Sequence, residues 1–93
     1  MLGQKIRELR ESRGLVQRQI ADALGIDTAF VSKVENGEKQ LSKTHLKKIA
    51  RLYSLSAEEL EVLWLADKLI RLTKEDENGQ HALEVALETL RSK

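Results

Sequence analysis

The sequence lacks cysteine and proline altogether, and it has one Trp, one Tyr and one Phe in 93 residues. Without cysteine there can be no disulfide, no thiolate nucleophile and no cysteine-based zinc site. No apolar run approaches the roughly 20 residues that span a bilayer, and the charged N-terminal stretch does not suit a signal peptide. These absences predict a cytoplasmic protein without membrane contact, and the length predicts one core rather than two.

The signals of an enzyme are missing as well. His45 and His81 stand alone, neither at metal-ligand spacing from a second histidine. We find no Ser/His/Asp order, no glycine-rich phosphate loop and no pair of acids that would converge. The sequence therefore predicts no catalytic residues, no metal site and no cofactor.

Charge is divided unevenly along the chain. Residues 1–56 carry eleven Lys and Arg against six Asp and Glu, a net charge of +5, whereas residues 57–93 carry five against nine, a net charge of −4. A basic first part suits a polyanionic partner such as DNA, and the acidic remainder is expected to face away from it. Chance asymmetry of solvated helix faces would give the same pattern.

The apolar spacing is helical throughout, which predicts an all-α protein, a compact bundle of five to six helices. Gly14 and Gly25 are expected to end helices, while Asp27, Ser42 and Ser56 are expected to begin them as N-caps, Ser56 within a capping box with Glu59. The expected helices cover 2–13, 17–24, 28–35, 42–53, 57–72 and 80–91.

Two of these helices, 17–24 and 28–35, are separated by a three-residue turn, the arrangement of a helix-turn-helix. Ala21 is small enough for a close crossing, and Gly25 permits the sharp reversal of the chain. Four residues of the second helix are then expected to point outward: Thr28, Ala29, Ser32 and Lys33.

Over residues 6–60 the chain resembles the Cro/repressor class of helix-turn-helix regulators, the xenobiotic-response-element family, with its lambda-repressor-like fold. The matching residues are Ile6-Arg7-Glu8-Leu9-Arg10, Gly14-Leu15, Gln17, Ile20-Ala21, Leu24-Gly25-Ile26, the run from Phe30 to Gly37, Leu46 and Ile49-Ala50. The resemblance implies a transcriptional regulator that binds double-stranded DNA.

The resemblance also implies roles for individual residues. The outward positions Thr28, Ala29, Ser32 and Lys33 would meet base edges in the major groove, which their side-chain chemistry allows. Backbone phosphates would be contacted by Gln17, Asn36, Lys39 and Lys43.

Two further features of the sequence bear on the same site, a pair of charges and a missing cap. Arg10 and Glu35 resemble a family ion pair that joins the first helix to the end of the recognition helix, although they could also be independent surface charges. Val16 stands where the family usually has a serine or threonine, so the customary side-chain cap before Gln17 is missing.

One recognition helix reads few base pairs, so a homodimer on a (pseudo)palindromic operator is expected. Residues 1–56 would be the DNA-binding core, and residues 57–93 would complete it and form the dimer contact. Alternatively, the last helix would fold back over this apolar surface within one protomer. The expected contact residues are Leu60, Leu63, Trp64, Ile70, Leu83, Leu87 and Leu90.

The biological role remains open at this point. Restriction-modification controller proteins, phage repressors and antitoxins share this size and pattern, and a protein-interaction module is a further alternative. The acidic run from Glu75 to Glu77 would contact RNA polymerase or a toxin, or simply face solvent.

Overall fold

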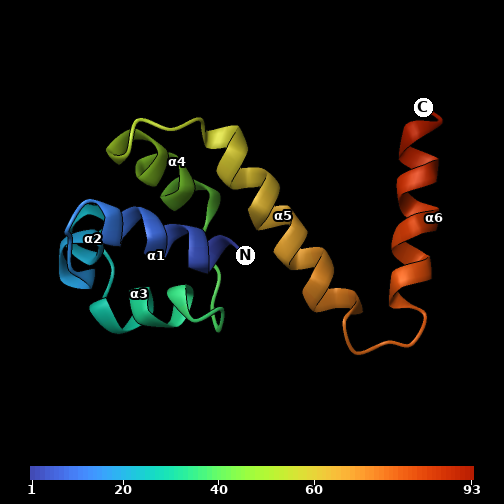
Figure 1. The fold of residues 1–93 in the computed structure, drawn as a ribbon, viewed down its shortest axis with the longest axis horizontal. Coiled ribbons are helices and arrows are strands. Elements are labelled where there is room, and N and C mark those ends of the chain that lie inside the picture. Colours follow the sequence, from blue (N-terminus) through green and yellow to red (C-terminus); the bar gives the residue numbers. More distant parts are fainter.

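A computed structural model describes all 93 residues as six α-helices with no strand, which confirms the all-α prediction. Figure 1 shows the helices of the N-terminal part of the chain gathered together, a long helix that leads away from them, and the C-terminal helix standing apart. None of the helices is both long enough and apolar enough to cross a bilayer. The helices are α1 (Leu2–Ser12), α2 (Gln17–Leu24), α3 (Thr28–Glu35), α4 (Lys43–Leu52), α5 (Ala57–Thr73) and α6 (Gly79–Arg91).

The core lies between α1, α2, α3, α4 and the first half of α5. Burying each large apolar side chain here contributes about 1.5–3 kcal/mol, which compensates the ordering of short helices that are not stable alone. Its buried members are Leu2, Ile6, Ile20, Ala21, Leu24, Val31, Val34, Leu41, Leu46, Ile49, Ala50, Tyr53, Leu60 and Trp64.

Helix α5 belongs to two environments. Its first half is bound to the core by Leu60, which is fully buried, and by Trp64, whose Nε1 donates to the carbonyl oxygen of Leu41 at 2.7 Å. These two residues are therefore not available for a dimer contact, and this part of the sequence-based prediction is wrong. A tryptophan with a partner for its N–H is stable inside a protomer, a point that periodicity alone cannot reveal.

Helix α6 does not fold back over the core. It packs against α5 and stands well away from α1–α4 (Figure 1). The buried residue of α6 is Gly79, at its start, where an added Cβ would overlap the carbonyl oxygen of Thr73. The alternative in which the last helix covers the apolar surface of its own protomer is therefore wrong.

The helix ends follow the sequence signals in part. Gly25 ends α2 in the left-handed region with φ +70°, and the Ser42 hydroxyl accepts the N–H of His45 at 3.3 Å. Asp27 and Ser56 occupy the N-cap positions, but neither side chain makes a capping hydrogen bond. The predicted capping box of Ser56 and Glu59 is therefore not formed.

Candidate nucleic-acid interface

Helix α3 has one side in the core and the other in solvent. Val31 and Val34 are buried, whereas Thr28, Ala29 and Lys33 are exposed and Ser32 is half-buried; these four residues form the outward face of α3. The three-residue turn after α2 sets α3 against α2 and α1, so that this face is not covered by the protein itself. The four residues predicted to contact bases thus share one accessible surface.

The far end of α3 is fixed by a buried carboxylate. Arg10 of α1 makes two hydrogen bonds to Glu35, from Nε to Oε2 at 2.8 Å and from Nη2 to Oε1 at 3.0 Å. The Glu35 side chain is fully buried and that of Arg10 is 14% exposed, so the two charges are largely removed from water. The structure therefore contains the ion pair that the resemblance implied, in the two-pronged geometry that guanidinium and carboxylate favour.

Two more side chains reach the same carboxylate. Gln17 donates from Nε2 to Oε1 of Glu35 at 3.0 Å, and Arg7 donates from Nε to that oxygen at 3.4 Å. Arg7 also donates from Nη2 to Oδ1 of Asn36 at 2.6 Å. Two predicted phosphate contacts, Gln17 and Asn36, are thus held by a single internal network.

The sequence analysis did not assign Arg7 to this network, although its spacing from Arg10 could have indicated the contact. It lies three residues before Arg10, so the two side chains share a face of α1 and can approach the same carboxylate.

The network changes the ionisation of Glu35. Burial by itself would raise the pKa of this carboxyl, but hydrogen bonds from Arg10, Gln17 and Arg7 and the charge of Arg10 outweigh burial and lower it. The same hydrogen bond to Glu35 raises the pKa of Arg10. The pair is therefore ionised at neutral pH, and it orients rather than transfers protons.

The start of α2 has a cap that the sequence analysis missed. Val16 cannot accept a hydrogen bond with its side chain, but its N–H donates to Oε1 of Gln19 at 2.8 Å. This is one half of a capping box, and a glutamine three residues after the N-cap is its sequence signal. The departure at Val16 is thus partly compensated.

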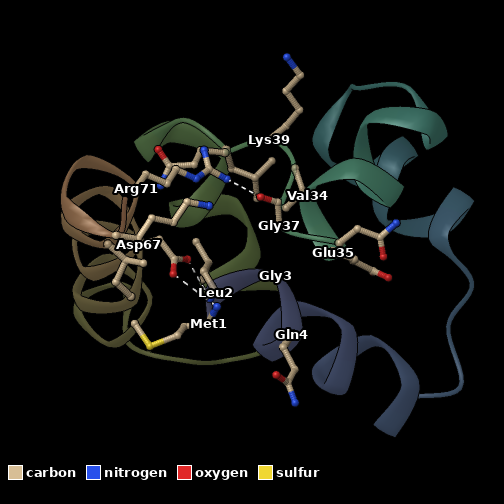
Figure 2. A pocket seen from close by; sticks show the side chains of 15 residues that line it. Met1, Leu2, Gly3, Gln4, Val34, Glu35, Gly37, Lys39, Asp67 and Arg71 are labelled. Atoms are coloured by element: carbon tan, nitrogen blue, oxygen red, sulfur yellow. Dashed lines mark hydrogen bonds and ion pairs between the residues drawn. The ribbon is translucent and has the colours of Figure 1, made fainter. Parts of the chain in front are cut away.

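The remaining predicted phosphate contacts lie beyond α3. Lys39 is exposed in the loop and extends away from the protein (Figure 2), and Lys43 begins α4 with its Nζ 5.6 Å from the centre of the Trp64 ring. Lys33, Lys39 and Lys43 have no ion-pair partner among the side chains of the chain. Their positive charges therefore remain available to an anion.

The other predicted dimer contacts differ in exposure. Ile70 is 41% exposed, Leu87 47% and Leu90 63%, while Leu63 and Leu83 are half-buried. Most of the exposed large apolar side chains of the protein lie on α5 and α6, although Leu63 itself packs against the core.

A short helix held against a second one by a tight turn, with its polar face uncovered and flanked by unpaired lysines, defines a DNA-binding helix-turn-helix. The helix-turn-helix family matches residues 6–60, and the chain belongs to this family of transcriptional regulators.

Individual relatives agree with this class. The chain is 31% identical to the cryptic phage CTXphi transcriptional repressor RstR of Vibrio cholerae, across 94% of this chain and 84% of that protein. It is 41% identical to the uncharacterized HTH-type transcriptional regulator RghRB of Bacillus subtilis, across 62% of this chain and 42% of that protein. With the HTH-type regulator PrpR of Mycobacterium tuberculosis it shares 34% identity over 12% of that protein, so the chain spans only part of some relatives.

A solved structure supports the fold. A transcriptional regulator from Listeria innocua superposes with a TM-score of 0.62 and 23% identity, covering 99% of this chain and 94% of that one. The likeness of fold thus extends over nearly the whole chain.

Proposed function

We propose that the protein is a repressor that binds a (pseudo)palindromic operator as a homodimer, with α3 of each protomer in the major groove. The observation that carries this proposal is the outward face of α3, which is uncovered and bordered by lysines without acidic partners. RstR, which aligns over most of its length, is a phage repressor by name, and this favours repression over activation.

The outward face of α3 carries groups that can contact guanine and groups that can contact thymine. Lys33 can donate to the O6 and N7 acceptors of guanine, and Ser32 can bond to several bases. The methyl groups of Thr28 and Ala29 can contact the methyl group of thymine.

The phosphates beside this face would be contacted by Gln17, Asn36, Lys39 and Lys43. Gln17 and Asn36 are held from behind by the Glu35 network, so less side-chain entropy is lost when they meet the backbone. Such contacts fix the register of α3 without reading sequence.

The dimer would form through the second half of α5 and α6. Half-sites one turn of DNA apart, about 34 Å, require two recognition helices held at a defined separation. Ile70, Leu87 and Leu90 leave apolar surface in solvent in the isolated protomer, together with the half-buried Leu83, whereas Leu63 packs against the core. A second copy of the chain would cover this surface, because its own α6 does not.

The operator proposal is tested by selecting bound duplexes from random DNA with the wild-type protein and two variants. We expect Lys33→Ala to weaken binding and to relax the preference at one base position, typically by about 1–3 kcal/mol. Gln17→Ala should weaken all duplexes about equally, because it contacts phosphate. Arg91→Ala, at the far end of α6, removes one charge remote from α3 and is the matched control. Unchanged affinity in both test variants would favour a protein-interaction module instead.

A further inference from the structure

From Trp64 onward, α5 lies along the loop that follows the recognition helix. The Trp64 carbonyl accepts from Nε2 of Gln40 at 3.3 Å, and its indole donates to Leu41. About two turns further on, Arg71 donates from Nη2 to the carbonyl oxygen of Gly37 at 2.7 Å. Residues 64, 68 and 71 share one face of the helix, and that face follows the loop and the start of α4.

Two cations on this face are held by neutral groups. The Nζ of Lys68 lies 3.8 Å from the centre of the Trp64 ring, and Lys43 approaches the same ring. Arg71 uses one of its nitrogens on a backbone carbonyl and makes no other hydrogen bond. A ring face or a carbonyl positions a cation without neutralising it, so both charges stay available to an anion.

The nearest acid on α5 is engaged elsewhere. Asp67 accepts the backbone N–H of Leu2 at 3.0 Å and is turned toward the start of α1 (Figure 2). In the same view the side chain of Arg71 points toward Gly37. Neither Lys68 nor Arg71 therefore has an internal counter-ion.

We propose that Lys68 and Arg71 bind DNA backbone phosphates, so that α5 extends the phosphate-binding surface begun by Lys39 and Lys43. This inference rests on the proposed DNA binding. It also revises the expectation that the whole acidic part of the chain faces away from DNA. The negative net charge of residues 57–93 conceals two cations, Arg71 beside the loop that follows the recognition helix and Lys68 over the Trp64 ring.

The backbone of DNA fits this set of cations better than an isolated anion does. The four cations come from the loop, from α4 and from α5, and two of them, Lys43 and Lys68, approach the same Trp64 ring. The other two, Lys39 and Arg71, line one cleft of about 310 Å³ together with Gly37, so the cations lie at more than one place. DNA presents a succession of charges, one per roughly 3.4 Å of each strand, whereas an isolated anion could meet the cations at only one of these places.

The test is the salt dependence of DNA binding. Removing one phosphate-binding cation should reduce the slope of log K against log salt by about 0.9, for the selected operator and for an unrelated duplex alike. We expect this reduction for Lys68→Gln and for Arg71→Gln, about twice as much for the double variant, and no change in base preference. Arg91→Gln makes the same change in net charge and should leave the slope as in the wild type.

A second pair of variants separates a charge contact from a structural role. Lys68→Arg and Arg71→Lys keep the charge and should keep the wild-type slope, even though Arg71→Lys alters the bond to Gly37. If Arg71→Lys reduces the slope as much as Arg71→Gln, Arg71 acts only by supporting the loop and the inference is overturned.

The outcomes also separate this inference from the proposal beneath it. Suppose that the double variant keeps the wild-type salt slope while Lys33→Ala still binds the operator more weakly. This result would overturn the inference and leave the proposed operator binding intact. A wild-type protein that ignores all duplexes would overturn both.

Discussion

The geometry of the site depends on one residue, Glu35, through its side-chain carboxylate. It receives hydrogen bonds from α1 and from α2 while belonging to α3, so it joins the three helices that present the DNA-binding surface. Burying a charge is costly unless it is paired and hydrogen-bonded, and here Arg10 and Gln17 meet that requirement. The pair thus contributes mainly a fixed orientation of α3.

At this scale we predict how Glu35→Gln changes stability. Because the folded-state pKa of Glu35 is lowered, the unfolded chain binds the proton first as pH falls. The contribution of Glu35 is thus complete above its unfolded pKa of about 4.3 and is lost as pH falls through the folded value. At pH 7 the variant should be less stable by about 3–5 kcal/mol, since Arg10 keeps little access to water, and this deficit should shrink in acid.

Urea unfolding between neutral and acid pH, at constant ionic strength, measures this effect. Glu84→Gln, an exposed change on α6 without a partner, should keep the pH dependence of the wild type. Parallel profiles for the wild type and Glu35→Gln would contradict the lowered pKa.

At the scale of the helices, most boundaries could be predicted from the sequence, because they depend on residues within a few positions of each other. Helices α2 and α3 have the expected bounds, and Gly25 ends α2 as expected. The caps at Asp27 and Ser56 were not predicted correctly, since a suitable residue at the N-cap makes a hydrogen bond only if its rotamer faces the helix. The need for glycine at position 3 was not predicted, because it arises from the close approach of Val34 in α3, a residue distant in the sequence.

The packing of α1 on α3 leads to a prediction at this scale. Gly3 is buried where an added Cβ would overlap the carbonyl oxygen of Val34. Alanine favours helices over glycine by about 1 kcal/mol, so Gly3→Ala would stabilise an isolated α1. In the protein we expect a net loss of about 1–3 kcal/mol in the free energy of unfolding, because backbone atoms must move apart.

Denaturant unfolding measures whether the gain in helix propensity or the overlap with Val34 dominates the change in the free energy of unfolding. Gln4→Ala, at the next and exposed position of α1, should change stability by less than about 0.5 kcal/mol. A stabilised Gly3→Ala protein would show that α1 and α3 are less closely packed than the structure has them.

At the scale of the whole molecule, the protein consists of a packed head and an arm. The head contains α1–α4 and the first half of α5. The arm contains the second half of α5 and α6, and it extends the molecule to 42 Å along its longest axis (Figure 1). The arm is poorly covered by its own chain, with Leu72 80% exposed and Leu90 63%. Apolar surface of this extent is typical of a contact with another protein.

Our last prediction concerns the proposed dimer. Leu83, Leu87 and Leu90 lie on one stripe of α6, so Leu87→Glu should place a charge within the interface and convert the dimer to a monomer in sedimentation equilibrium. Binding to a full operator should then weaken strongly, while binding to a single half-site changes little. Val85→Glu is the matched control, because Val85 is 52% exposed but lies off the stripe. A dimer that persists in Leu87→Glu would require a different interface.

The sequence by itself determined the helices, the tight turn at Gly25 and the polar face of α3, because periodicity and turn chemistry act between residues that are near in the chain. Only the tertiary structure decided that Trp64 lies inside the protomer, that α6 stands apart, and that Arg71 lies beside Gly37. The physical reason is that α5 carries more apolar residues than one stripe can bury. Which of them are covered depends on the shape of the surface formed by the other helices, and no local pattern encodes that shape.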